Sequence, residues 1–158
     1  MVTTLLPLSG AVAQDAVFTT PSGRQVTLSS LQGKVVVLVF SAIQSPQCRD
    51  EFKLLTSLGE RYNAKPVASF WVSINPFNVA SNEKLKSSCS PASSVAVLRD
   101  PSQAAFKRFS KNQNQIPTIV ILDKRGLLCG EPIGGFNPDP DFVNTLAGVI
   151  DSLLAQSK

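Results

Sequence analysis

The residues best suited to chemistry lie in the segment SPQCRDEF, residues 45–52, which directly follows a run of apolar residues. Cys48 is a potential nucleophile, and Ser45, three residues before it, is a favourable helix N-cap. Pro46 suits the first helical position, so Cys48 is predicted in the first turn, where free backbone amides lower the pKa of a thiol. Glu51 would share a helix face with Cys48 and could relay protons to or from it. The segment therefore indicates a reactive thiol with a nearby carboxylate.

Composition removes several other classes of site. Histidine is absent from the 158 residues, which excludes Ser-His and Cys-His catalytic pairs and removes the commonest metal ligand. The cysteines at 48, 89 and 129 lack the paired spacing of zinc and iron–sulfur sites, so neither a metal nor another cofactor is expected. They allow one disulfide and one free thiol, but the sequence does not choose the partners. Cys89 is interpreted either as a redox partner of Cys48 or as an inert loop thiol, and Cys129 as a core or edge residue.

Charge and hydropathy give no sign of a nucleic-acid or membrane partner. The net charge of +4 is small, and the basic cluster of Lys107, Arg108 and Lys111 is typical of a solvated helix face. No stretch is long and apolar enough to predict an integral membrane span. The length predicts one domain with a substantial core.

The first residues differ in character from the rest of the chain. Residues 1–14 are weakly apolar, and Ala11-Val12-Ala13 resembles the small-x-small site of a signal peptidase. We therefore expect a leader or partial signal segment at 1–14 and the folded domain at 15–158.

Apolar runs and helical periodicity alternate along the domain, which predicts an α/β fold. The buried strand at 35–40, the helix that begins at Pro46 and the strand at 66–74 form a βαβ unit, whose right-handed crossover makes the two strands parallel. A hairpin turn is predicted at 123–126. The other predicted strands are 16–19, 25–28, 95–98, 118–122 and 127–133, and the other predicted helices are 79–86, 102–111 and 141–155.

Three groups of residues carry a family resemblance. They are Leu28-Ser29-Ser30-Leu31-Gln32-Gly33-Lys34, then Phe40 with Ala42 and Cys48-Arg49-Asp50-Glu51-Phe52, and finally Ile116-Pro117-Thr118. Together they resemble the TlpA/ResA-like thiol-disulfide oxidoreductases of the thioredoxin-like superfamily. The resemblance implies a thioredoxin-like fold, with a central mixed sheet flanked by helices and an amino-terminal β extension. It also implies a cis-proline at Pro117 facing the active cysteine, and a periplasmic or otherwise extracytoplasmic location.

Ser45 stands where that family has the first cysteine of its Cys-x-x-Cys motif. The usual cycle, in which the second thiol resolves a mixed disulfide, cannot close within a Ser-x-x-Cys motif. The first hypothesis is therefore an oxidoreductase with Cys48 as a single thiol at a degenerate site. The predicted catalytic residues are Cys48, Ser45, Glu51 and Pro117, and the predicted substrate-binding residues are Pro46, Gln47 and Ile116. Its expected partners are protein thiols or disulfides and an external thiol reductant.

Two alternatives remain open from the same residues. Ser-x-x-Cys is similar to the site of peroxiredoxins, in which a hydroxyl orients the peroxide and the cysteine becomes a sulfenic acid. However, Ser41 stands where that family has a proline, and no arginine lies near Pro117. The third hypothesis is a redoxin fold retained for binding, with Cys48 inert, because Ser41 and Gln44 replace the aromatic residues that flank the family motif.

Overall fold

The computed structural model describes residues 15–87, 95–111, 114–135 and 139–156, so the predicted leader at 1–14 and Cys89 lie outside the described residues. Within these ranges, seven strands form one mixed sheet in the order β2-β1-β5-β4-β3-β6-β7. The strands are β1 (Val17–Thr19), β2 (Gln25–Thr27), β3 (Val35–Ser41), β4 (Val67–Ser73), β5 (Ala96–Arg99), β6 (Thr118–Leu122) and β7 (Ile133–Gly134). The helices are the 3₁₀ turn η1 (Leu28–Leu31), α1 (Cys48–Arg61), α2 (Asn82–Ser87), α3 (Ala104–Phe109) and α4 (Pro140–Leu154).

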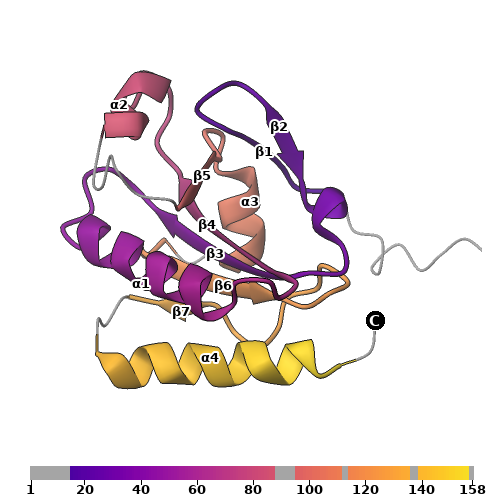
Figure 1. Ribbon diagram of the computed structural model, residues 1–158. Coiled ribbons are helices and arrows are strands. Elements are labelled where there is room, and N and C mark those ends of the chain that lie inside the picture. The colour runs from indigo at the N-terminus through magenta and orange to yellow at the C-terminus, as the bar shows by residue number, and fades with distance from the viewer. Residues whose placement is uncertain (1–14, 88–94, 112–113, 136–138, 157–158) are drawn as a thin grey trace, which may run out of the picture.

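Strand β3 is the centre of the sheet. It runs parallel to β4 and antiparallel to β6, and all seven of its residues are buried. Successive side chains of a strand point to opposite faces. One set therefore packs with α1 and α4, and the other packs with α3, which lies on the opposite face in Figure 1. The first set is Val35, Val37 and Val39, and the second is Val36, Leu38 and Phe40. A strand covered on both faces explains its continuous apolar sequence.

A tyrosine joins the two helices on the α1 face. The buried Tyr62, which directly follows α1, places its hydroxyl 3.1 Å from the carbonyl oxygen of Ala147 and 2.9 Å from Oδ1 of Asp151, both in α4. Burial and the neighbouring Asp151 carboxylate raise the pKa of Tyr62 to about 12. The phenol therefore stays neutral and holds α1 against α4 across the physiological pH range.

Apart from the start of α1, three predicted elements differ from the structure. The return strand predicted at 127–133 is reduced to a bridge between Leu122 and Leu128 and the short β7, because Gly130 has φ +69° and Pro132 has no N–H to donate to a ladder. The helix predicted from residue 79 begins at Asn82. The helix predicted from residue 102 begins at Ala104, because Gln103 has φ +62° and cannot belong to a right-handed helix.

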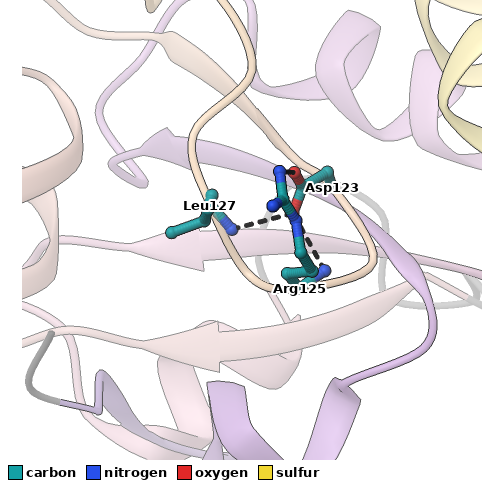
Figure 2. Close-up of polar contacts among 3 residues, drawn as sticks. All are labelled: Asp123, Arg125 and Leu127. Atoms are coloured by element: carbon teal, nitrogen blue, oxygen red, sulfur yellow. Dashed lines mark hydrogen bonds and ion pairs between the residues drawn. The ribbon is translucent and has the colours of Figure 1, made fainter. Parts of the chain in front are cut away.

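The predicted hairpin turn at 123–126 is closed by a buried aspartate (Figure 2). Oδ1 of Asp123 accepts hydrogen bonds from the backbone N–H groups of Arg125 (2.9 Å) and Leu127 (3.0 Å), and Oδ2 lies 3.0 Å from the Arg125 guanidinium. Burial alone would raise the pKa of this carboxyl, but the Leu127 and Arg125 donors outweigh it and hold the pKa below its ordinary value. The carboxylate therefore stabilises this end of the sheet in its charged form.

Candidate functional site

The cysteine identified from the sequence lies at the start of α1, beside the end of β3 (Figure 1). The predicted helix start is wrong by two residues: Cys48 is the first residue of α1, and Gln47 rather than Ser45 precedes the helix. Residues 45–48 form a turn in which the Cys48 N–H donates to the carbonyl oxygen of Ser45 at 3.1 Å. Ser45 is not the N-cap of α1: its hydroxyl accepts from the backbone N–H of Gln47 at 3.3 Å, before the helix begins, and it has a second partner, to which it donates.

That partner is Glu51, whose carboxylate is fully buried. The hydroxyl of Ser45 donates to Oε2 of Glu51 at 3.0 Å, and the indole Nε1 of Trp71 in β4 donates to Oε1 at 2.9 Å. Both carboxylate oxygens therefore have a donor, which a buried carboxylate needs. Trp71 is a site residue that was not predicted from the sequence, although a buried indole N–H requires an acceptor and this is the single tryptophan of the chain.

Cys48 itself is buried, with 5% of its surface exposed, and it is disulfide-bonded. Cys48 is therefore not a free thiol in this state of the protein. Cys129 is a free cysteine and is half-buried at the edge of the sheet. The third cysteine of the sequence, Cys89, lies outside the described residues.

The predicted cis-proline segment lies at the beginning of β6, next to the end of β3. The Ile116–Pro117 peptide bond is cis, Pro117 is buried, and Thr118 pairs with Phe40 of β3. Ile116 is half-buried. This arrangement brings the segment to the same end of the sheet as the first turn of α1.

A pocket of about 400 Å³ opens between these segments. Of the predicted site residues, Ser45, Pro46 and Ile116 line it, whereas Cys48, Gln47, Glu51 and Pro117 are not among its lining residues. The complete lining is Ala42, Gln44, Ser45, Pro46, Ile74, Asn75, Pro76, Val79, Gln103 and Ile116.

Asn75, another residue that the sequence analysis did not assign to the site, joins the loop after β3 to the end of β4. Its Oδ1 accepts from the backbone N–H of Ile43 (2.9 Å) and from the hydroxyl of Ser73 (3.1 Å). Its Nδ2 donates to Oε1 of Gln44 at 2.7 Å. Gln44 therefore does more than replace a family aromatic, because it fixes one wall of the pocket.

Arg99, the last residue of β5, holds the segment between β4 and α2 in place. Its fully buried guanidinium donates to Oδ1 of Asn82 (2.9 Å) and to the carbonyl oxygens of Asn75 (3.2 Å) and Ala80. It also lies 4.0 Å from the ring centroid of the exposed Phe77. Burial lowers the pKa of Arg99. These bonds hold the backbone at Asn75 and Ala80, within the segment between β4 and α2 that contributes Asn75, Pro76 and Val79 to the pocket lining.

The described part of the chain offers neither a metal centre nor a spanning helix. No group of three or more cysteine, aspartate or glutamate residues in it could hold a metal ion. None of the helices within the described ranges has the length and apolarity needed to cross a bilayer.

A protein-family model matches most of the chain, including the segments that form the site. The model of the AhpC/TSA family matches residues 9–129, which include the cysteine, the buried glutamate and the cis-proline segment. No curated protein matches the chain.

Solved structures with the same architecture are numerous. The chain is similar to a proposed protein disulfide isomerase from Bacteroides thetaiotaomicron, with 25% identity, a TM-score of 0.74, and coverage of 91% of this chain and 88% of that one. A proposed thiol:disulfide interchange protein, DsbE, from Chlorobium tepidum shares 24% identity with a TM-score of 0.73, covering 90% of this chain and 95% of that one. The exposed lipoprotein thioredoxin of Streptococcus pneumoniae shares 21% identity with a TM-score of 0.70, covering 89% and 100%. The predicted thioredoxin-like α/β fold is confirmed.

Proposed function

Because the chain belongs to the AhpC/TSA family of redoxins, we propose that it is a thiol-disulfide oxidoreductase whose reacting group is Cys48. The observation that carries this proposal is the disulfide of Cys48 at the start of α1, one helical turn before the buried, doubly hydrogen-bonded Glu51. A disulfide at this position is the oxidised product that a thiol-disulfide cycle must form.

We propose Cys89, which lies outside the described residues, as the second cysteine of the cycle. Two observations support this choice: Cys48 is disulfide-bonded, and Cys129, the other cysteine of the chain, is free. This pairing replaces the missing first cysteine of the Cys-x-x-Cys motif, whose position Ser45 occupies. The usual two-thiol cycle then closes between distant positions of the chain rather than within one motif.

The cycle balances with an external thiol as the reductant. The Cys48 thiolate attacks a substrate disulfide, forms a mixed disulfide and releases one substrate thiol. The Cys89 thiolate then attacks the Cys48 sulfur, releasing the second substrate thiol and forming the intramolecular disulfide. Two molecules of an external thiol restore the dithiol and become a disulfide themselves, so two electrons pass from that thiol to the substrate.

Ser45 and Glu51 have positioning and proton-transfer roles in this scheme. Ser45 links the loop before α1 to Glu51, and Trp71 holds the other carboxylate oxygen. A fixed carboxylate near the start of α1 can accept the proton of the Cys48 thiol and return it to a leaving thiolate. Pro117, Ile116, Pro46 and Gln47 are proposed to shape the surface on which the substrate lies.

Peroxidase chemistry is the second candidate, because the matching family model and the Ser-x-x-Cys spacing both suit it. A peroxide would oxidise the Cys48 thiolate to a sulfenic acid and leave as an alcohol, and the Cys89 thiol would displace water to give the same disulfide. This chemistry is favoured by a cation at the reacting oxygen. Arg49 is exposed, and the guanidinium of Arg99 is already engaged by Asn82, Asn75 and Ala80, so we rank exchange first.

One experiment separates the two candidates. The reduced protein is mixed either with a peptide disulfide or with an alkyl hydroperoxide, and the loss of free thiols is followed over time in the parent chain and in Cys48→Ala. Rapid oxidation by the peptide disulfide that requires Cys48 supports the proposal. Oxidation by the hydroperoxide alone would overturn it in favour of the peroxidase. Failure of both reagents to react at Cys48 would favour a binding protein.

The proposed location is extracytoplasmic. A disulfide persists in an oxidising compartment and is rare in the cytosol. The similarity to DsbE and to an exposed lipoprotein thioredoxin supports the same location.

A further inference from the structure

The lining of the 400 Å³ pocket indicates which class of substrate could bind near Cys48. Its ten lining residues are all uncharged, and they combine aliphatic or proline surfaces with amide side chains. Its lining residues Ser45 and Pro46 come two to three residues before Cys48, the first residue of α1, so the pocket adjoins the segment that carries the reactive cysteine.

Two glutamines give the pocket one donor and one acceptor. Oε1 of Gln44 accepts from Asn75, and Nε2 of Gln103 donates to the carbonyl oxygen of Ile74 at 3.2 Å. The other amide atoms of these two glutamines are Nε2 of Gln44 and Oε1 of Gln103, and neither has a hydrogen-bond partner within the described part of the chain. An amide donor and an amide acceptor complement the C=O and N–H groups of a polypeptide backbone.

The backbone at Gln103 is a second, independent indication. Its φ of +62° is a conformation that a residue with a side chain rarely adopts and that glycine adopts freely. A non-glycine residue in this conformation at the rim of a pocket points to a role for its side chain. The strain is compatible with the fold because Asp100 holds the following turn, with Oδ2 accepting from the Phe106 N–H at 2.7 Å.

We propose that this pocket binds an uncharged polypeptide segment next to the substrate cysteine, with Gln103 as the residue that determines this specificity. Gln44 donates to a backbone carbonyl of the segment, Gln103 accepts from a backbone N–H, and an aliphatic side chain contacts Ile74 and Val79. Glutathione fits poorly, because its two carboxylates find no cation among the lining residues. This inference rests on the proposed function, since it names the substrate class of the same site.

The test compares three disulfides on the reduced, full-length chain. They are the disulfide of acetyl-Val-Cys-Ala-amide, glutathione disulfide, and hydroxyethyl disulfide, which is neutral and too small to fill the pocket. The neutral peptide should react fastest in the parent chain. Gln103→Gly should slow the peptide reaction by roughly two- to tenfold, the value of one hydrogen bond, without changing the hydroxyethyl disulfide reaction. Gln103→Lys should speed the glutathione disulfide reaction by about two- to fivefold, as an exposed charge pair would.

Ala64→Gly is the matched control. Ala64 has φ +67° in the turn after α1 and is not a pocket residue, so this variant relieves the same backbone strain away from the site. It should leave all three rates unchanged. Equal rates for the peptide and glutathione disulfides, or Gln103 variants that behave like Ala64→Gly, would overturn the inference while leaving the proposed function intact. Failure of all three disulfides to react at Cys48 would instead contradict the proposed function and this inference with it.

Discussion

The two ends of the central strands differ in how their polar groups are satisfied. The hairpin end comprises the start of β3 and the turn at 123–126, and the site end comprises the end of β3, the start of α1 and the start of β6. At the hairpin end, the Asp123 carboxylate accepts from three donors, and the Gly33 N–H joins the turn to the start of β3 by donating to the Lys124 carbonyl at 2.8 Å. At the site end, Oγ of Ser41 and Nε of Arg99 are buried without a partner in the described part of the chain. The comparison indicates that the hairpin end is built for stability and that the site end keeps irregular features beside its reactive cysteine.

The comparison predicts that substitutions at the site end change exchange more than stability, and that substitutions at the hairpin end do the reverse. The largest effect is expected for Cys48→Ala, which removes the proposed nucleophile and should reduce disulfide exchange to the rate of the uncatalysed reaction. Cys129→Ala is the matched control, because Cys129 is a free cysteine on the sheet edge. Exchange measured with a peptide disulfide should be unchanged in this control, and an equal loss in both variants would contradict the assignment.

Trp71→Phe is expected to affect both the stability of the fold and disulfide exchange. It leaves Oε1 of Glu51 buried without its donor, which should cost about 1–3 kcal/mol in the free energy of unfolding. If Glu51 also accepts the proton of the Cys48 thiol, the pH profile of the exchange rate should shift as well. Denaturant unfolding and exchange rates across pH measure the two effects.

Tyr62→Phe is the control for Trp71→Phe, since it also removes one buried donor from the α1 face but lies away from Glu51. We expect a loss of about 1 kcal/mol without a change in the pH profile. An unchanged profile in Trp71→Phe would leave Glu51 with only a structural role.

Asp123→Asn should lower the free energy of unfolding by about 1 kcal/mol at neutral pH and leave the rate of disulfide exchange unchanged. The pKa of Asp123 is lower in the folded protein than in the unfolded chain, so its charged form stabilises the fold above the unfolded value of about 4. This contribution is lost as the pH falls through the lowered folded pKa. The stability difference between the variant and the parent chain should therefore shrink in acid, and a difference that grows there would contradict the account.

The smallest effect is expected for Arg49→Ala. Arg49 follows Cys48 directly, but it is exposed to solvent and lies outside the pocket lining. Its removal should change the exchange rate by less than about twofold, as is usual for exposed positions. A large loss of peroxide consumption in this variant would instead show that Arg49 activates Cys48, and would favour the peroxidase.

The sequence predicted the features that local patterns encode. The apolar run of β3, the turn at Asp123 and the position of Cys48 at a strand-to-helix junction are all readable from neighbouring residues. The predicted N-cap at Ser45 is wrong because residues 45–48 form a turn, in which the Cys48 N–H donates to the Ser45 carbonyl oxygen, and α1 begins only at Cys48.

The remaining site features depend on contacts between distant residues. Trp71 lies 20 residues from its partner Glu51, and Asn75 lies 32 residues from Ile43. The positive φ of Gln103 has no signal in a sequence that lacks glycine at that position. Periodicity reports which face of an element is buried, but it does not report which buried polar groups meet.

The most direct test of the central claim is a count of free thiols in the full-length protein across thiol-disulfide buffers of decreasing potential, with mass mapping of the oxidised form. We predict one free thiol, Cys129, in the oxidised protein and three in the reduced protein, with a two-electron transition and a Cys48–Cys89 linkage. In Cys89→Ser, Cys48 should become a free thiol without loss of the fold. Three free thiols at every potential, or a linkage of Cys48 to Cys129, would contradict the account.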